Sequence, residues 1–330
     1  MKEGNHNILA GLFLLAVALV LPVFLKNSRY TLNILNLAGI FVVFAYSLNF
    51  IHGYLGLISI GQAGFFAIGA YVTAGLTMAV GLNYFFSLFL AATASSVAGA
   101  LIGFPATRIR GHYFVLITLG FGEIVRLIIL NWNEVTNGTN GVNNIPPPTL
   151  GPWAFDSRLS YYYLVLFFVV LTLLVTLSLR CSKYGRSMLA LKVSEQAATL
   201  MGVNPTVNKL ISFCLSSFFA GLAGGLYASF IGSISPEPFG VNLSVDVLTM
   251  LLVGGSGTVA GPVVGAVFLV VLKEWLRFMK EYYMIVYGAG IVLVMIFMPE
   301  GIAGLVRNLM VRLHPGASET GGYTGRSSRC

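Results

Sequence analysis

The sequence predicts an all-α polytopic membrane protein with about 8–10 transmembrane helices, some of them discontinuous helices broken by glycines. Hydrophobic residues make up 57% of its 330 residues, and charged residues only 9%. A soluble domain carries roughly a quarter charged residues, so this composition leaves too little polar surface to face water. Apolar runs long enough to cross a bilayer core, which takes about 20 helical residues, recur along the chain.

The candidate spans are the apolar segments between polar connections. They cover residues 8–25, 31–51, 58–80, 84–106, 113–131, 161–179, 210–231, 244–256, 259–276 and 282–298. The first is expected to be a retained span, because it is longer than a typical signal-peptide core and no small-x-small cleavage site follows it. Glycines break the stretch 244–276, which is expected as one kinked span or two short ones. Two cytoplasmic termini require an even number of crossings, which favours two.

Lysine and arginine placement sets the expected orientation. Segment 180–209 carries Arg180, Lys183, Arg186, Lys192 and Lys209 against a single acidic residue, Glu195. This segment is therefore expected in the cytoplasm, together with both termini. The loop 132–160 contains no lysine and one arginine, and its many Asn, Gly and Pro residues predict a turn-rich cap on the opposite side. The tail 306–330 is rich in Ser, Gly and Thr, which predicts disorder.

Residues 187–201 predict a short amphipathic helix inside this polar segment. Apolar Met188, Leu191, Ala198 and Met201 fall close to one face of a 3.6-residue period. Gly202, followed by an Asn-Pro pair, stops the helix. The apolar face is expected to be uncovered by its own chain. It then either lies on the lipid surface or fills a groove in a partner protein.

Two glycine-rich stretches, 53–80 and 244–276, predict discontinuous helices that line a translocation path. The candidate path residues in them are Gly61, Gln62, Gly64, Gly69, Gly254, Gly255, Gly257 and Gly261. An interrupted helix exposes backbone N–H and C=O groups, which at membrane depth have to face protein or a wet cavity. Glycines that serve only close helix packing give the same pattern, so both interpretations stay open.

Glu123 is a further path candidate, because it stands in the apolar run TLGFGEIVRLIILNW. A carboxylate there is costly, so it is expected to face the bundle interior with a partner. Arg126, three residues later, lies on the same helical face. One interpretation is that the pair lies near the pathway, where Glu123 would be the proton site of an ion-coupled carrier. The other is that the two charges neutralise each other and fix helix packing.

The chain shows no complete motif for bond chemistry. It contains neither the P-loop pattern GxxxxGK[ST] nor HExxH. Gly254–Gly257 match the GxSG of rhomboid-type proteases, but the only later histidine is His314, in the tail. The three cysteines lack metal-ligand spacing, and the net charge of +8 is expected on cytoplasmic loops and not at a nucleic-acid interface. No catalytic residue, metal site or bound cofactor is predicted.

Five separated stretches resemble, in order, the signature stretches of LivM-type permeases of branched-chain amino acid ABC importers. They are GYLGLISIGQAGFFAIGAYV (53–72), GHYFVLITLGFGEIVRLI (111–128), NGTNGVNNIP (137–146), GRSMLALKVSEQAATLMGVN (185–204) and LLVGGSGTVAGPVVGA (251–266). The resemblance covers about residues 30 to 305. It implies a bacterial inner-membrane permease without enzymatic activity, paired with a LivH-like permease. It also implies two ATPase subunits that hold ATP and Mg²⁺, and a periplasmic substrate-binding protein.

The apolar pattern and the resemblance together give an expected organisation, and the resemblance also implies a set of site residues. Residues 1–30 would form a first span and connector, 31–305 the permease domain with a cytoplasmic coupling segment at 180–209, and 306–330 a tail. The residues that match the EAA-type coupling pattern are Gly185, Glu195, Ala197, Ala198 and Gly202. Gln62 stands where many members have His, and His112 where Asp is common, so the substrate stays open. A urea or amide permease of the same family, and an ion-coupled carrier using Glu123, are the alternatives.

Overall fold

The computed structural model describes residues 28–107, 109, 111–150 and 153–278, with isolated positions on either side (19, 22, 286, 288, 289, 292, 301, 302 and 304). The described chain is helical almost throughout, and the prediction of an all-α membrane protein is confirmed. The candidate spans 8–25 and 282–298 and the tail 306–330 lie outside the described residues, apart from those isolated positions.

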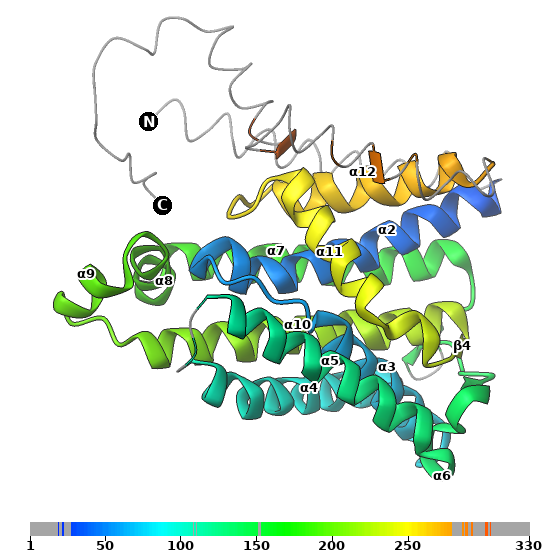
Figure 1. Cartoon of the computed structure of the whole chain (residues 1–330). Coiled ribbons are helices and arrows are strands. Elements are labelled where there is room, and N and C mark those ends of the chain that lie inside the picture. The colour runs from blue at the N-terminus through cyan, green and yellow to red at the C-terminus, as the bar shows by residue number, and fades with distance from the viewer. Residues whose placement is uncertain are drawn as a thin grey trace, which may run out of the picture.

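Five described helices are long and apolar enough to cross a membrane (Figure 1). They are α2 (Arg29–Leu48) with its π-helical end η1 (Asn49–Gly53), α4 (Tyr84–Ala106), α5 (His112–Asn131), α7 (Arg158–Cys181) and α10 (Pro205–Ile231). Three shorter helices complete the bundle: α3 (Gln62–Met78), α11 (Val241–Gly254) and α12 (Gly261–Leu276). Local chemistry sets the starts of the helices. At α10, for example, the Asn204 side chain accepts a hydrogen bond from the Val207 amide, and Pro205 occupies the first turn.

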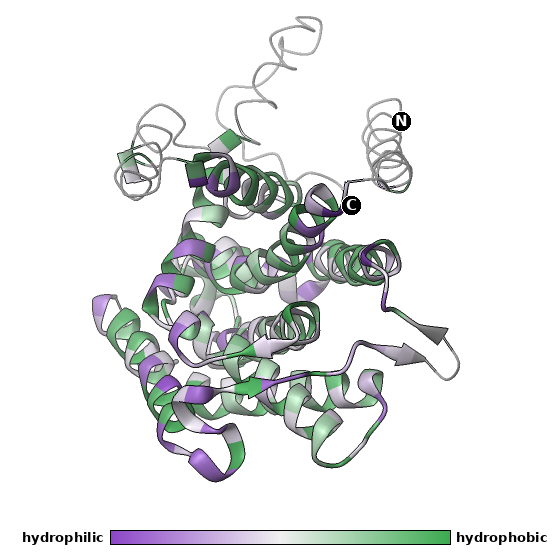
Figure 2. Ribbon diagram, turned by 90° about the vertical axis from the view of Figure 1, so that its right-hand side faces the viewer, coloured by the Kyte–Doolittle hydropathy of each residue, from purple (hydrophilic) through white to green (hydrophobic). Residues whose placement is uncertain are grey.

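Helix α10 lies at the centre of the bundle and packs most extensively against α4 and α3. The crossing with α3 is close because both helices present glycines. A Cβ atom built on Gly69 would overlap the backbone carbonyl of Gly221, and one on Gly224 would overlap that of Phe66. Such contacts let helix backbones approach where lipid supplies no hydrophobic driving force. Figure 2, viewed from the end that carries α6 and β4, shows hydrophobic residues over most of the helices.

The loop 132–160 forms an ordered, turn-rich cap at one end of the bundle, as its composition predicts. It contains α6 (Asn133–Thr136), η2 (Gly138–Asn140), β1 (Val142–Asn143), β2 (Thr149–Leu150) and β3 (Trp153–Ala154). Strands β2 and β3 pair with each other, whereas β1 pairs antiparallel with β4 (Ser233–Ile234), which follows α10. Asn137 adopts a left-handed conformation, which asparagine tolerates. The cap is therefore bonded to the α10–α11 connection, which also holds η3 (Glu237–Phe239).

The two glycine-rich stretches are broken, but at fewer places than their glycines suggest. The stretch 244–276 forms two short helices, as expected, with a turn at 255–260 between α11 and α12. Gly261 is not a second break, because it begins α12. In the other stretch the chain leaves helical structure at 56–61, before α3, and again at 79–80, after α3 has ended. Gly64 and Gly69 lie inside a continuous α3, where they make close contacts with α5 and α10.

The coupling segment 180–209 contains two short helices where one was predicted over 187–201. They are α8 (Lys183–Val193) and α9 (Glu195–Leu200). Ser194 separates them, because its backbone is extended and its side chain accepts a hydrogen bond from the Ala197 amide, which makes it the N-cap of α9. Figure 1 places both helices at the end of the bundle opposite α6 and β4. The α4–α5 connection shares this end, since Lys209 Nζ donates to the carbonyl of Thr107 at 3.5 Å.

Candidate functional site

The predicted apolar face of the coupling segment is mostly covered by the protein itself. Met188 is fully buried, and Leu191 and Ala198 are buried with it in the main core. Ser212 of α10 donates a hydrogen bond to the Met188 sulfur at 3.2 Å. The expectation of an uncovered face is therefore wrong for these three residues, because α8 packs against the ends of α7 and α10 and an ion pair between Glu195 and Lys209 holds α9 on α10. Periodicity identifies an apolar face but does not say which chain covers it.

Three other apolar side chains of the coupling segment are almost fully exposed, and we call them the distal patch. Val193 and Leu200 are each 88% exposed, and Met201 is 86% exposed. They lie at the break between α8 and α9 and at the end of α9. Of the predicted face, only Met201 belongs to this patch. The sequence signal that could have located it is Ser194, a capping residue that ends the continuous period assumed for 187–201.

Glu195, the acidic residue of the coupling pattern, is anchored to α10. Its Oε1 accepts a hydrogen bond from Lys209 Nζ at 2.9 Å, and the Lys209 side chain is only 5% exposed. The ion pair fixes the start of α9 on the bundle, and Ala198 in the same helix is buried. At the start of α8, a Cβ atom on Gly185 would overlap the carbonyl of Leu179, so this glycine lets α8 turn closely against α7. Glu195 and Gly185 therefore hold the coupling segment against α10 and α7 of the same chain.

Gly202 ends α9 with a left-handed backbone, φ +84°. Its amide donates to the Thr199 carbonyl at 3.0 Å, which satisfies one of the carbonyls left free at a helix end. A side chain would meet open space here, so the backbone angle and not the space favours glycine. The structure therefore confirms the predicted helix end at Gly202. The backbone at this glycine sets the direction in which the chain enters α10.

Lys192 joins the coupling segment to the membrane helices. Its Nζ donates a hydrogen bond to the carbonyl of Gly53 at 2.8 Å, at the π-helical end of α2. Burial lowers the pKa of the Lys192 ammonium below the usual value for lysine. The same ammonium lies near Gly257 of the α11–α12 turn, since a Cβ atom built there would be 3.6 Å from Nζ. The structure thus brings the coupling segment and both glycine breaks together at one point.

The turn at 255–260 is held on the end of α2 by polar side chains. Asn49 Oδ1 accepts from the Gly257 amide at 2.9 Å, and Asn49 Nδ2 donates to the Thr258 carbonyl at 3.2 Å. The Tyr46 hydroxyl donates to the Val259 carbonyl at 2.6 Å. These bonds satisfy backbone groups that the helix break would leave free. Sequence reasoning missed Asn49, although an amide side chain inside the apolar run 31–51 was a visible signal.

Gly61 and Gln62 lie in a buried polar cluster at the start of α3. Gln62 Nε2 donates to Ser216 Oγ of α10, and the Ala63 amide donates to Ser244 Oγ of α11, both at 2.9 Å. A Cβ atom on Gly61 would overlap the carbonyl of Thr118 in α5. Gln62 is fully buried, and its Oε1 has no hydrogen-bond partner in the described part of the chain. The start of α3 therefore contacts α5, α10 and α11 through buried polar groups.

Glu123 has the predicted partner but not the predicted surroundings. Arg126 Nε donates to its Oε1 at 2.9 Å. The two side chains are 34% and 25% exposed, so they lie on a partly open face of α5 and not in the bundle interior. A second acidic residue of an apolar helix, Asp246, is also paired. It lies inside α11 and pairs with Lys273 of α12 at 2.5 Å, which ties the two short helices together.

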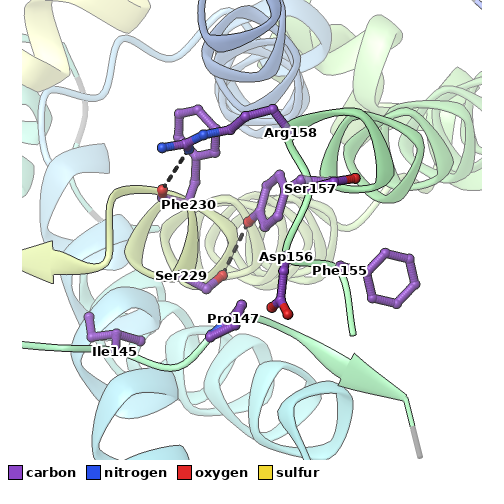
Figure 3. Close-up of a pocket in the computed structure, with 9 residues that line it drawn as sticks. Ile145, Pro147, Phe155, Asp156, Ser157, Arg158, Ser229 and Phe230 are labelled. Carbon is purple, nitrogen blue, oxygen red and sulfur yellow. Dashed lines mark hydrogen bonds between the residues drawn. The ribbon is translucent and has the colours of Figure 1, made fainter. Parts of the chain in front are cut away.

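A pocket of about 200 Å³ lies at the opposite end of the bundle, between the start of α7 and the end of α10 (Figure 3). Arg158 covers the Phe230 ring at 5.0 Å and donates to the Phe230 carbonyl at 3.4 Å. Tyr161 donates to the Leu226 carbonyl at 2.6 Å and also bonds the Ser229 hydroxyl. These bonds of Arg158 and Tyr161 fix α7 to α10.

Comparison with known proteins identifies the group to which this arrangement belongs. The family described as branched-chain amino acid transport system / permease component matches residues 30–295. The chain belongs to this family. It is 39% identical to the high-affinity branched-chain amino acid transport system permease protein LivM of Salmonella typhimurium over 317 residues, which cover 89% of this chain and 74% of that protein. It is 38% identical to LivM of Escherichia coli over 334 residues, covering 94% and 77%.

A second type of permease is also similar. LivH of Salmonella typhimurium is 24% identical over 301 residues, which cover 85% of this chain and 96% of LivH. The predicted resemblance to LivM-type permeases is confirmed by the family match and the LivM identities. The family is one of transport permeases and not of enzymes.

Proposed function

We propose that this chain is the membrane-spanning permease subunit of an ATP-driven importer that carries branched-chain, hydrophobic amino acids across the bacterial inner membrane. The observation that carries the proposal is the identity of 38–39% with LivM proteins over most of the chain. Transport by such a subunit involves no bond chemistry of its own. ATP and Mg²⁺ would be held by partner ATPases, whose cycle biases the permease between outward- and inward-open states.

The proposed assembly contains a second, LivH-like permease, two ATPase subunits and a periplasmic substrate-binding protein. The distal patch supports docking of an ATPase, because it is exposed apolar surface at the basic end of the bundle. Basic connections favour the cytoplasm, so this end and both termini are assigned there, and the cap 132–160 to the periplasm. The similarity to LivH supports a pair of related permeases that enclose one path.

The glycine breaks fit the chemistry of the proposed substrate. The charged ends of a zwitterionic amino acid need polar groups inside the membrane, and helix ends provide them. The buried cluster around Gln62, with an unused amide oxygen at the start of α3, is such a place. We therefore keep Gly61 and Gln62, and the turn glycines Gly254, Gly255 and Gly257, as candidate path residues. An apolar surround suits the aliphatic side chain of the substrate.

Reconstitution of the chain with the LivH-like permease, the ATPases and the binding protein tests this proposal. We expect leucine uptake into vesicles that requires ATP and the binding protein, and no uptake without the ATPases. A proton or sodium gradient alone should drive nothing, since Glu123 is paired with Arg126 and does not stand alone as a proton site. Gradient-driven uptake without ATPases would contradict the proposal and favour an ion-coupled carrier.

The distal patch gives a second prediction. Replacing both Leu200 and Met201 by aspartate should reduce capture of the ATPases by about tenfold or more, because two exposed apolar anchors become charged. Val80→Asp is the matched control, since Val80 is 62% exposed and follows α3 in a connection. The measurement is the amount of ATPase co-purified per permease from detergent-solubilised membranes. Equal capture by both variants would show that the patch is not the docking surface.

A further inference from the structure

We propose that Lys192 is a positioning residue that transmits movement of the coupling segment to both glycine breaks at once. The inference rests on the proposed function, because it concerns how work done at the coupling segment reaches the membrane helices. It assigns a role to a lysine outside the matched coupling pattern. The argument starts from three segments far apart in the chain that meet at its ammonium group.

The first contact is with the break that precedes α3. Lys192 Nζ donates to the Gly53 carbonyl at 2.8 Å, and the stem of the side chain crosses Gly56. A Cβ atom built on Gly56 would be 3.1 Å from Lys192 Cγ, and the backbone there has φ +73°. The non-helical stretch 56–61 follows directly and leads to the polar cluster at Gln62. One end of this break is therefore bonded to the coupling segment, and the other lies at the candidate path.

The second contact is with the turn between α11 and α12. Gly257 approaches Gly53 so closely that a Cβ atom on Gly53 would be 2.8 Å from the Gly257 nitrogen. The Gly257 amide is itself bonded to Asn49 Oδ1 at 2.9 Å. Lys192 thus sits where the two breaks touch, and a side chain on Gly53 would also overlap Asn49 Oδ1. Movement of either break alone would separate groups that are bonded here.

The chemistry of the contact explains why it is suited to transmit movement. A hydrogen bond from a charged donor is about twice as strong as a neutral one, and this one is part-buried, so water competes for it only from one side. The acceptor lies in a π-helical turn, Asn49–Gly53, and such turns inside helices are frequent at functional sites. When α8 moves, Gly53 therefore has to follow Lys192, and the turn at Gly257 moves with it.

The test compares Lys192→Met with wild type in the reconstituted complex. We expect ATP hydrolysis within about twofold of wild type, while leucine molecules carried per ATP fall by about tenfold, the loss of one charge-assisted bond. Lys192→Arg, which keeps a charged donor, should restore most of that ratio. Lys183→Met is the matched control, because Lys183 is a lysine of the same helix whose ammonium lies over the ring of its neighbour Tyr184. An unchanged ratio in Lys192→Met, or a parallel loss of hydrolysis and uptake, would overturn the inference.

A second measurement separates this inference from the proposed function. Amide hydrogen exchange of the purified permease, without partners or substrate, reports the stability of each break directly. Lys192→Met should speed exchange in both 53–61 and 255–260, and Lys183→Met in neither. Faster exchange in only one segment, or in none, would overturn the link. If the wild-type complex carries no leucine, the proposed function fails and the exchange result still decides the role of Lys192.

Discussion

Gly69→Leu should remove almost all folded permease from the membrane. Gly69 faces α10 at its closest crossing with α3, where an added Cβ atom would overlap the Gly221 carbonyl. The obstructing atoms belong to the backbone of α10, so no side chain can rotate to make room. Overpacking of a core costs about 1–3 kcal/mol when side chains can shift, and we expect more than that here. Separation of α3 from α10 would also open the polar cluster at Gln62.

The same helix supplies the control for this prediction. Gly75 also lies in α3, but a Cβ atom built there meets nothing within 4 Å. Gly75→Leu should therefore leave the melting temperature of the detergent-purified protein close to that of wild type, while Gly69→Leu gives no monodisperse protein or a much lower melting temperature. Matching melting curves for the two variants would show that the α3–α10 crossing has room for a larger side chain at Gly69.

The membrane helices were predictable because their physics is local. The predicted spans 84–106 and 113–131 differ by no more than a residue at each end from α4 and α5. Length and apolar content decide such helices almost alone. The break at 254–257 was also readable, since consecutive glycines interrupt an apolar run. Gly64 and Gly69 show the limit of this reasoning, because a glycine that breaks a helix and one that packs it look alike in sequence.

The coupling segment was harder to predict because its structure depends on contacts distant in sequence. Met188 and Leu191 form an apolar face, but only the folded chain shows that α10 already covers it. In the sequence Lys192 is only one of several basic residues of the segment. Its hydrogen-bond partner, Gly53, is 139 positions away, so no local pattern singles it out. Glu123 was expected inside from its cost in lipid, and an adjacent arginine allows it a partly exposed face. A sequence pattern therefore predicts the chemical character of a residue and its local structure, but not the residue distant in sequence that it contacts.

Glu195→Arg should abolish transport while the protein remains inserted. The change removes the partner of Lys209, whose side chain is only 5% exposed, and places a second cation beside it. Breaking a buried pair on one side costs about 3–5 kcal/mol, and partial exposure of Glu195 reduces this to about 1–3 kcal/mol. Because the spans do not depend on this pair, we expect α9 alone to detach from α10. ATPase capture and ATP-dependent leucine uptake are the measurements, and Glu134→Arg, at an exposed glutamate of α6 in the opposite cap, is the control.

A double variant decides whether Glu195 acts by anchoring α9 or by touching the ATPase. Glu195→Gln combined with Lys209→Met leaves no unpaired buried charge, and neutral replacement of both members of a buried pair is often tolerated. If the anchor is what matters, this variant should capture ATPase far better than Glu195→Arg, with most of the uptake restored. If the carboxylate itself bound the ATPase, the double variant would fail as completely as the single one. The position of the Lys209 ammonium, 2.9 Å from Glu195 Oε1 and shielded from solvent, favours the anchor.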